Sequence, residues 1–237
     1  MFDQSAEFYD AFYDALGKDY AAEARAIATL IEQQRAGAST LLDVACGTGR
    51  HLEFLSTSMQ CVGVDIEPGL LAVAEDRCPT VTFAVADMRT LDLGRTFDVV
   101  TCLFSSIGYM PTVEGLRQSI RSMSNHLHPG GLLIIEPWFH PETWTAGRTQ
   151  VLDAQLPDGR RAVRMMTSKT EVSASVLDTH YLVSDGTSIA HTSERHVLGL
   201  FSRDTYTDAL TAAGLSVQWD TFGLTGRGLA IGTAPAR

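Results

Sequence analysis

Two glycines and two aspartates have the most informative spacing in this sequence. Gly47 and Gly49 lie in the segment LLDVACGTGR, where an apolar run ends in small residues. Glycine lets a ligand approach the backbone, and the free N–H groups at the start of a following helix attract polar ligand groups. Asp65 and Asp87 end two later apolar runs. An acid about 20 residues beyond a glycine loop can accept hydrogen bonds from both hydroxyls of a ribose. The pattern predicts a nucleoside site.

Each of these residues also has a structural explanation of its own. The glycines suit a plain strand–helix turn, and either aspartate suits a helix cap. Asp87 precedes Met88, where a carboxylate could accept a hydrogen bond from an adenine amino group. Ligands of open parallel sheets lie at the carboxyl ends of the strands. The joint placement at three consecutive strand ends therefore favours a ligand site.

Strand-like and helix-like patterns alternate through the first part of the chain. Strands are predicted over residues 40–46, 61–66, 81–87, 97–104 and 132–138, and helices over residues 22–34, 49–58, 68–77 and 112–127. Pro68 is expected in the first turn of its helix. The strand predicted over 97–104 contains a continuous apolar run, as in strands buried on both faces. Alternation of this kind predicts a parallel sheet with helices on both faces.

The pattern changes after Trp138, where short β-like runs separated by turns predict a small antiparallel sheet. Ser202 is expected to cap a further helix that ends near Gly214, and two last strands then close the main sheet as a hairpin. The predicted organisation is a core of residues 1–147 and 202–237, with an N-terminal segment 1–22, and an inserted antiparallel β subdomain of residues 148–201 over the substrate cleft.

Composition excludes several classes of partner. The chain has 237 residues and a net charge of −10, which argues against nucleic acid or an anionic membrane as the main partner. The four cysteines lack metal-ligand spacing and indicate reduced thiols, with no metal expected. The N-terminus is too polar for a signal peptide, and no apolar run approaches the roughly 18 residues of a membrane span. A cytoplasmic location is expected.

Three segments carry a family resemblance. A dinucleotide fingerprint requires a third glycine where this chain has Leu52. The segments LLDVACGTGRH, VGVDIEPGLLAVAE and ADMRTLDLGRTFDVV instead resemble the motifs of class I S-adenosylmethionine (SAM)-dependent methyltransferases over residues 40–136. The resemblance implies an α/β fold with a Rossmann-like seven-stranded sheet and helices on both faces. It implies SAM as cofactor, S-adenosylhomocysteine as product and a cofactor site that includes Tyr20, Ala45, Gly47, Gly49, Asp65, Ile66, Asp87, Met88 and Phe104.

A narrower resemblance extends over nearly the whole chain. The segments GKDYAAEA, FSSIGYM, EPWFHPETW and LFSRDTY are similar to those of the dTDP-aminosugar N,N-dimethyltransferases, which make desosamine- and mycaminose-type sugars for antibiotics. The resemblance implies a SAM-dependent N-methyltransferase that methylates, once or twice, the amino group of a deoxysugar carried on thymidine diphosphate (dTDP). It is also compatible with a homodimer.

A diphosphate requires positive charge or N–H donors. Arg227, between two glycines, is the best candidate, because a guanidinium can hold phosphate through two N–H groups. Arg164 in the predicted insertion is a second candidate. Trp138 follows a strand end and is expected to line the sugar or thymine pocket. The alternatives are an arginine on a surface hairpin and a tryptophan that packs beneath the insertion.

The N-terminal segment is rich in tyrosine. The resemblance implies that it folds over both ligands as a lid, with Tyr20 near the SAM carboxylate or sulfonium and Tyr9 or Tyr13 near the sugar phosphates. Tyrosines of an amphipathic helix also commonly pack on a core, which is the alternative.

Tyr109 is the proposed catalytic residue, since in the resembling family its position carries Tyr or His. A free tyrosine has a pKa of about 10, so it is a poor base at neutral pH, and orientation of the amine is favoured over general-base work. Ser105 and Ser106 could bind the amine or a neighbouring hydroxyl, or could cap the strand end.

Three other functions are compatible with parts of the pattern. A SAM-dependent O- or N-methyltransferase of another small natural product would keep the cofactor residues without needing Arg227. A SAM-binding sensor would bind the cofactor without turnover. A nicotinamide-dependent oxidoreductase is disfavoured by Leu52.

Overall fold

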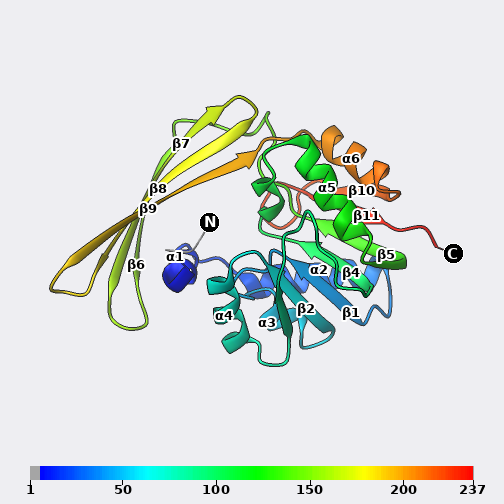
Figure 1. The fold of residues 1–237 in the computed structure, drawn as a ribbon, viewed down its shortest axis with the longest axis horizontal. Helices are drawn as coiled ribbons and strands as arrows, with labels where there is room; N and C mark the ends of the chain where they lie inside the picture. The colour runs from blue at the N-terminus through cyan, green and yellow to red at the C-terminus, as the bar shows by residue number, and fades with distance from the viewer. Residues whose placement is uncertain (1–5, 237) are drawn as a thin grey trace.

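The computed structural model describes residues 6–236, which form a layered α/β core and a long four-stranded sheet that projects from it (Figure 1). The helices are η1 Ala6–Phe8, α1 Tyr9–Ala15, α2 Tyr20–Gln34, α3 Leu52–Leu55, α4 Pro68–Arg77, η2 Ser106–Tyr109, α5 Val113–Ser124 and α6 Arg203–Ala212. The strands are β1 Thr40–Val44, β2 Gln60–Asp65, β3 Thr82–Val85, β4 Phe97–Cys102, β5 Leu127–Ile135, β6 Thr149–Gln155, β7 Arg161–Glu171, β8 Ala174–Ser184, β9 Ile189–Gly199, β10 Ser216–Asp220 and β11 Leu229–Thr233.

The core sheet has seven strands in the order β10-β11-β5-β4-β1-β2-β3. Strands β1 to β5 are parallel where they pair, and β11 runs antiparallel to both β5 and β10. The predicted α/β fold with a closing hairpin is therefore confirmed. The chain reverses its direction of winding beside β1, with β2 on one side and β4 on the other, which opens a crevice at the carboxyl ends of these strands.

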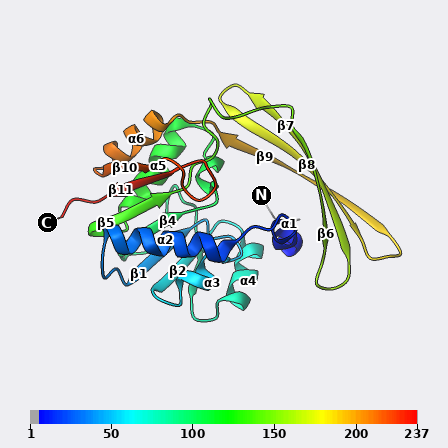
Figure 2. The ribbon, with the colours of Figure 1, turned by 180° about the vertical axis from the view of Figure 1, so that it is seen from behind.

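Helices cover both faces of this sheet (Figures 1 and 2). On one face Ile27 of α2 and Leu52 of α3 are fully buried against Leu41 of β1. On the other face α5 and α6 bury Ile120 and Leu210. Each such side chain contributes about 1.5–3 kcal/mol through removal from water. No helix among residues 6–236 combines the length and apolar composition that a bilayer crossing needs.

Side-chain caps fix where several helices begin. Asp19 accepts a hydrogen bond from the Ala22 N–H at the start of α2, and Ser202 accepts one from the Thr205 N–H at the start of α6. Such caps satisfy backbone donors that have no partner within the helix. The predicted Ser202 cap is confirmed, and so is the predicted glycine near the helix end, since Gly214 follows α6 with φ of +84°.

The helix after the glycine loop is shorter than its sequence pattern predicts. The predicted helix over residues 49–58 contracts to the single turn of α3. Gly49 has φ of +75°, outside the right-handed helical region, which delays the start. The hydroxyls of Thr57 and Ser58 donate to the Phe54 and Leu55 carbonyls, and such local bonds compete with helix continuation.

The second sheet has the antiparallel order β6-β7-β8-β9 and occupies residues 149–199. Helix α1 lies between this sheet and the core (Figures 1 and 2). Phe8 and Phe12 are buried against the inner face of the sheet, together with Tyr181, whose ring centroid lies 5.2 Å from that of Phe8. The sheet, α1 and the strand ends of the core thus enclose one space.

Candidate active site

A cavity of about 800 Å³ lies between the carboxyl ends of the core strands, helix α1 and the inner face of the four-stranded sheet. Its volume is near the upper end of the range for small-molecule sites. The predicted site residues that line it are Tyr9, Tyr13, Tyr20, Ala45, Gly47, Asp65, Ile66, Asp87, Met88, Phe104, Ser105, Ser106, Tyr109, Trp138, Arg164 and Arg227. The structure therefore brings together residues from both ends of the chain.

Gly49 is the predicted site residue that does not line the cavity. A Cβ at this position would lie 3.2 Å from the Ala74 Cβ and 3.6 Å from the Cys78 sulfur, and φ is +75°. Glycine is required here because α4 packs closely against the turn, in a backbone conformation that L side chains rarely adopt. Its role is to shape the loop that presents Gly47.

Backbone strain concentrates around the cavity. Ala45, Phe104 and Ser105 have φ of +58°, +53° and +61°, and all three line the cavity. Non-glycine residues in the left-handed region are uncommon, and strain of this kind gathers at ligand sites. The loops after β1 and β4 are thus held in conformations that sequence propensity alone does not favour.

Asp65 organises the glycine loop from the end of β2. Its carboxylate accepts the Gly47 N–H at 2.8 Å and the Glu67 N–H at 2.9 Å. Burial raises the pKa of Asp65, while these two backbone bonds oppose the shift. A carboxylate has about four acceptor positions, so two remain for ligand hydroxyls. The arrangement fits the ribose of a nucleoside.

Asp87, at the end of β3, is already paired. Arg89 reaches back to bind both carboxylate oxygens, with its Nε 3.0 Å from each, and its backbone N–H also donates to Asp87. The Arg89 side-chain hydrogen bonds lower the pKa of Asp87 and keep it ionised. Asp87 also lines the cavity, and the acceptor positions that Arg89 does not occupy remain for a ligand.

A cationic and phenolic corner marks one end of the cavity. The Tyr20 ring lies between Lys18 and Arg50, each 4.8 Å from its centroid. The Tyr20 hydroxyl and the Arg50 Nε are buried and have no hydrogen-bond partner within residues 6–236. A buried donor without a partner costs free energy, so these two atoms indicate a position where a ligand acceptor would bind. A carboxylate such as that of the SAM methionine fits both.

Asp43 is buried beneath the same corner. Its carboxylate accepts a hydrogen bond from the Thr101 hydroxyl at 2.7 Å. Burial raises the pKa of Asp43 to about 6, although His51 nearby and the Thr101 bond oppose the shift. Asp43 lines the cavity and, with a pKa of about 6, supplies negative charge there at neutral pH.

Tyr109 lies in η2 and lines the same cavity. Its hydroxyl lies 3.3 Å from Nδ1 of His196, which reaches it from β9. Burial raises the pKa of Tyr109 well above 10, and nearby Tyr13, Tyr181 and Glu194 add to the shift. The phenol therefore stays protonated, in agreement with a role in orientation. Ser105 donates its hydroxyl to the Pro137 carbonyl at 2.7 Å, so it is left as an acceptor.

Arg227 enters the cavity from the loop between β10 and β11. Its guanidinium lies 5.8 Å from the Trp138 ring centroid and 5.4 Å from that of Phe139. Its Nη2 lies 3.2 Å from Glu136, which is fully buried at the end of β5. The Arg227 Nε is buried without a hydrogen-bond partner in the described residues. Glu136 thus holds the Arg227 guanidinium in place, and the Nε–H group of Arg227 remains available to a ligand.

Arg164 of β7 faces the cavity from the opposite wall. It donates to Gln150 at 3.1 Å and lies 5.4 Å from the Phe12 ring centroid. Its Nε is also buried and unbonded among residues 6–236. Two arginines with unused donors therefore line one cavity of a chain with a net charge of −10. This arrangement suits an anionic ligand group.

The tyrosines of α1 complete the wall. The Tyr13 ring lies 4.9 Å from that of Tyr9 and 4.8 Å from that of Phe104, measured between centroids. Asp10 anchors this helix to the core, because it accepts bonds from the Thr48 hydroxyl at 2.7 Å and from Arg77 at 2.6 Å. Helix α1 is therefore both part of the wall and a cover.

Several site residues escaped sequence analysis. Arg50 directly follows the glycine loop, and its position in the quoted motif was a usable signal. Glu136, Tyr181, Glu194 and His196 had no such signal, because their neighbours in space come from distant segments. The sequence analysis therefore found the lining residues at the ends of β1, β2 and β3 more completely than those around Tyr109.

The fold is that of a class I SAM-dependent methyltransferase. A family model described as a methyltransferase domain matches residues 41–131. A solved SAM-bound amino pentose methyltransferase from Micromonospora echinaspora is similar, with a TM-score of 0.85 and 38% identity over 95% of each chain.

Relatives narrow the class to a family. A dTDP-3-amino-3,4,6-trideoxy-alpha-D-glucopyranose N,N-dimethyltransferase from Streptomyces venezuelae is 42% identical over 96% of both chains. A dTDP-4-amino-2,3,4,6-tetradeoxy-D-glucose N,N-dimethyltransferase from Saccharopolyspora spinosa is 39% identical over 96% of this chain and 91% of its own length. The crystal structure of DesVI from S. venezuelae matches with a TM-score of 0.90 over 98% of both chains. The chain belongs to the dTDP-aminosugar N,N-dimethyltransferases, and it is a SAM-dependent N-methyltransferase.

Proposed function

We propose that this enzyme methylates the amino group of a dTDP-linked aminodeoxysugar in antibiotic biosynthesis. The observation that carries the proposal is the pair Arg164 and Arg227, whose buried Nε atoms have no hydrogen-bond partner within residues 6–236. Both face a cavity whose wall is otherwise rich in aromatic side chains. Guanidinium groups bind phosphate oxygens through pairs of N–H donors, so a diphosphate is the group that these arginines suit.

The cofactor residues act by holding and orienting. When bound, SAM supplies an electrophilic methyl group. Asp65 accepts hydrogen bonds from the ribose, while Tyr20 and Arg50 donate to the carboxylate of the methionine part. The buried unpaired donors of these two residues and the remaining acceptor positions of Asp65 support this assignment.

The acceptor residues act by alignment and by exclusion of water. Tyr109 orients the sugar amine, Ser105 and Ser106 lie beside it, and Trp138 lines the sugar or nucleobase. Helix α1 covers the cavity. Positioning of two reactants in line can supply a large part of the rate enhancement of such a displacement.

The free thiols of the four cysteines support a cytoplasmic location.

Purified enzyme incubated with SAM and a panel of dTDP-aminosugars is expected to add two methyl groups to the amine of at least one of them. The panel contains 3-amino and 4-amino sugars, because relatives at 39–42% identity act on each kind. Product mass is the readout, and dTDP alone is expected to compete with the sugar. SAM binding without competition by dTDP would instead favour the methyltransferase of an unrelated natural product.

We also propose that α1 is a lid held by Asp10. Asp10→Asn is expected to raise the KM for both ligands by a few-fold, since partly buried ion pairs of this kind contribute about 1 kcal/mol. Asp76→Asn on the exposed side of α4 makes the same charge change and serves as control. Steady-state kinetics at low and high salt provide the measurement. Equal KM values for the two variants would argue against the lid.

A further inference from the structure

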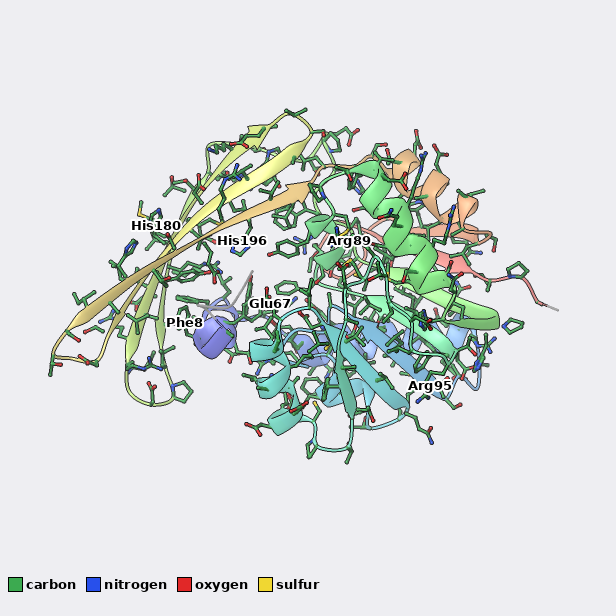
Figure 3. All side chains as sticks on the ribbon, in the orientation of Figure 1. Phe8, Glu67, Arg89, Arg95, His180 and His196 are labelled. Carbon is green, nitrogen blue, oxygen red and sulfur yellow. The ribbon has the colours of Figure 1, made fainter. Side chains whose placement is uncertain are left out.

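A carboxylate, an imidazole and a phenol form a chain in the wall of the cavity, between β9 and η2. Glu194 and His196 are two residues apart on β9, so both side chains point to the same face of the strand. Each side chain is only 5% exposed. His196 lines the cavity and lies on the side of β9 that faces the core (Figure 3). Tyr109 meets it from the core.

The distances in this chain define a direction for hydrogen bonding. The Tyr109 hydroxyl lies 3.3 Å from Nδ1 of His196, and Nε2 lies 3.4 Å from the Glu194 carboxylate. Tyr181 donates its hydroxyl to the same carboxylate at 3.1 Å. An ionised carboxylate can only accept, so the neutral imidazole carries its proton on Nε2. Nδ1 is then the acceptor for the Tyr109 phenol.

The proposed reaction creates a need for such a chain. An amine attacks through its lone pair, so a sugar ammonium must lose a proton before each methyl transfer. Helix α1 and the four-stranded sheet flank the site, and His196 itself is buried, which limits the access of water to its imidazole. Tyr109 alone cannot accept the proton, because burial raises its pKa and keeps the phenol protonated. The base must therefore be a group that is hydrogen-bonded to the Tyr109 hydroxyl.

We infer that His196 is the proton acceptor for the substrate amine, acting through Tyr109 and held by Glu194. This inference rests on the proposed function. The ammonium N–H bond breaks, and its electron pair stays on nitrogen as the attacking lone pair. That proton passes to the Tyr109 oxygen as the phenol proton passes to Nδ1. The products are a neutral amine, a neutral tyrosine and an imidazolium paired with Glu194.

The charges around this chain favour the step. Glu194 on β9 and Asp65 on β2 disfavour a negative charge on Tyr109, and Tyr13 on α1 and Tyr181 on β8 act in the same direction. Glu194, 3.4 Å from Nε2, is the carboxylate that would pair with the imidazolium. Arg164 on β7 and Arg148, directly before β6, are cations that line the cavity from this side, and a diphosphate bound at Arg164 would offset its charge. His196 thus acts through Tyr109, which it orients and from which it accepts the proton.

The test is the pH dependence of kcat for His196→Asn, which keeps a polar group near Nδ1 but cannot hold a proton. At neutral pH kcat is expected to fall by about tenfold to a hundredfold, at or below the usual contribution of a positioned acid–base group. The loss should shrink by about tenfold per pH unit as pH rises toward the pKa of the free amine, because the substrate then arrives deprotonated. The KM for SAM should stay near that of the wild type.

Two further variants keep the outcome decisive. Glu194→Gln preserves side-chain shape and should show the same pH shift to a smaller extent, so it decides the matter if His196→Asn does not fold. His191→Asn, on the opposite face of β9, is the matched control and should keep the wild-type profile. A loss that is equal at every pH, or no loss, would overturn the inference while leaving the proposed function intact. Failure of the wild type to methylate any dTDP-aminosugar would remove both.

Discussion

Replacement of Arg227 with alanine is expected to raise the KM for the dTDP-aminosugar by about a hundredfold, with little change in SAM binding. The expected loss corresponds to two charge-assisted hydrogen bonds to phosphate, at about 1.5 kcal/mol each. The unbonded Nε and the position of the guanidinium beside Trp138 and Phe139 are the structural basis. Arg227→Lys should recover only part of the loss, because an ammonium lacks the planar pair of donors.

The same change is expected to destabilise the fold. Glu136 is fully buried and accepts bonds from the Phe104 N–H at 2.7 Å, the Thr225 hydroxyl at 2.6 Å and Arg227 at 3.2 Å. Removal of the cation leaves a buried carboxylate without an opposite charge, which typically costs about 3–5 kcal/mol. The low end applies here, because two of the hydrogen bonds remain. Chemical denaturation is the measurement.

A double variant separates the two effects. Arg227→Ala combined with Glu136→Gln removes both charges and is expected to regain much of the stability. The KM for the sugar should stay high, because the phosphate donor is still missing. Recovery of the KM together with stability would mean that Arg227 acts only through the fold.

The convergence of residues at the ends of β1, β2 and β3 was predictable because it follows from local rules. Parallel strands end at one edge of the sheet, so Gly47, Asp65 and Asp87 had to converge once the alternation of strands and helices was recognised. Their spacing in the sequence therefore carried three-dimensional information. The same holds for Ser202 and Gly214, whose capping roles depend only on their own helix.

The acceptor end depends on pairings that no local pattern encodes. Glu136 and Arg227 meet because β11 inserts antiparallel beside β5, with Ala230 opposite Ile135. His196 reaches Tyr109 because β9 is long enough to return over the core. Alternation along β9 indicates which residues share a face, but not what lies opposite that face. A histidine partner for Tyr109 was therefore missed.

Gly49 illustrates a limit of a different kind. The sequence alone does not show whether a loop glycine is needed for the close approach of a ligand or of a neighbouring helix. The structure distinguishes the two, since a Cβ at Gly49 would meet Ala74, whereas one at Gly47 would meet nothing within 4 Å. The shortened α3 has a similar origin, since its starting residue is fixed by the turn rather than by the apolar pattern that follows.

Replacement of Asp65 with alanine is expected to weaken SAM binding by about a hundredfold to a thousandfold. The ribose loses its acceptor, at about 1.5–3 kcal/mol for each hydrogen bond to the charged group. The Gly47 and Glu67 N–H groups lose theirs as well, so the glycine loop is no longer held in its binding conformation. Calorimetric titration with SAM and with S-adenosylhomocysteine measures the effect on both.

Two control variants determine whether the effect comes from the ribose contact. Asp65→Asn keeps an oxygen acceptor for one backbone N–H but has no charge, so an intermediate loss is expected. Asp87→Ala should cost much less, because its carboxylate already binds Arg89 and is less buried than Asp65. If Asp65→Ala bound SAM as well as Asp87→Ala did, the ribose would have to lie elsewhere. The ionised Asp65 carboxylate accepts more and stronger hydrogen bonds than the protonated acid. Because burial raises the pKa of Asp65, SAM affinity should also fall as pH drops, beginning above the ordinary carboxyl pKa. Asp65→Asn should lose the part of this pH dependence that belongs to Asp65.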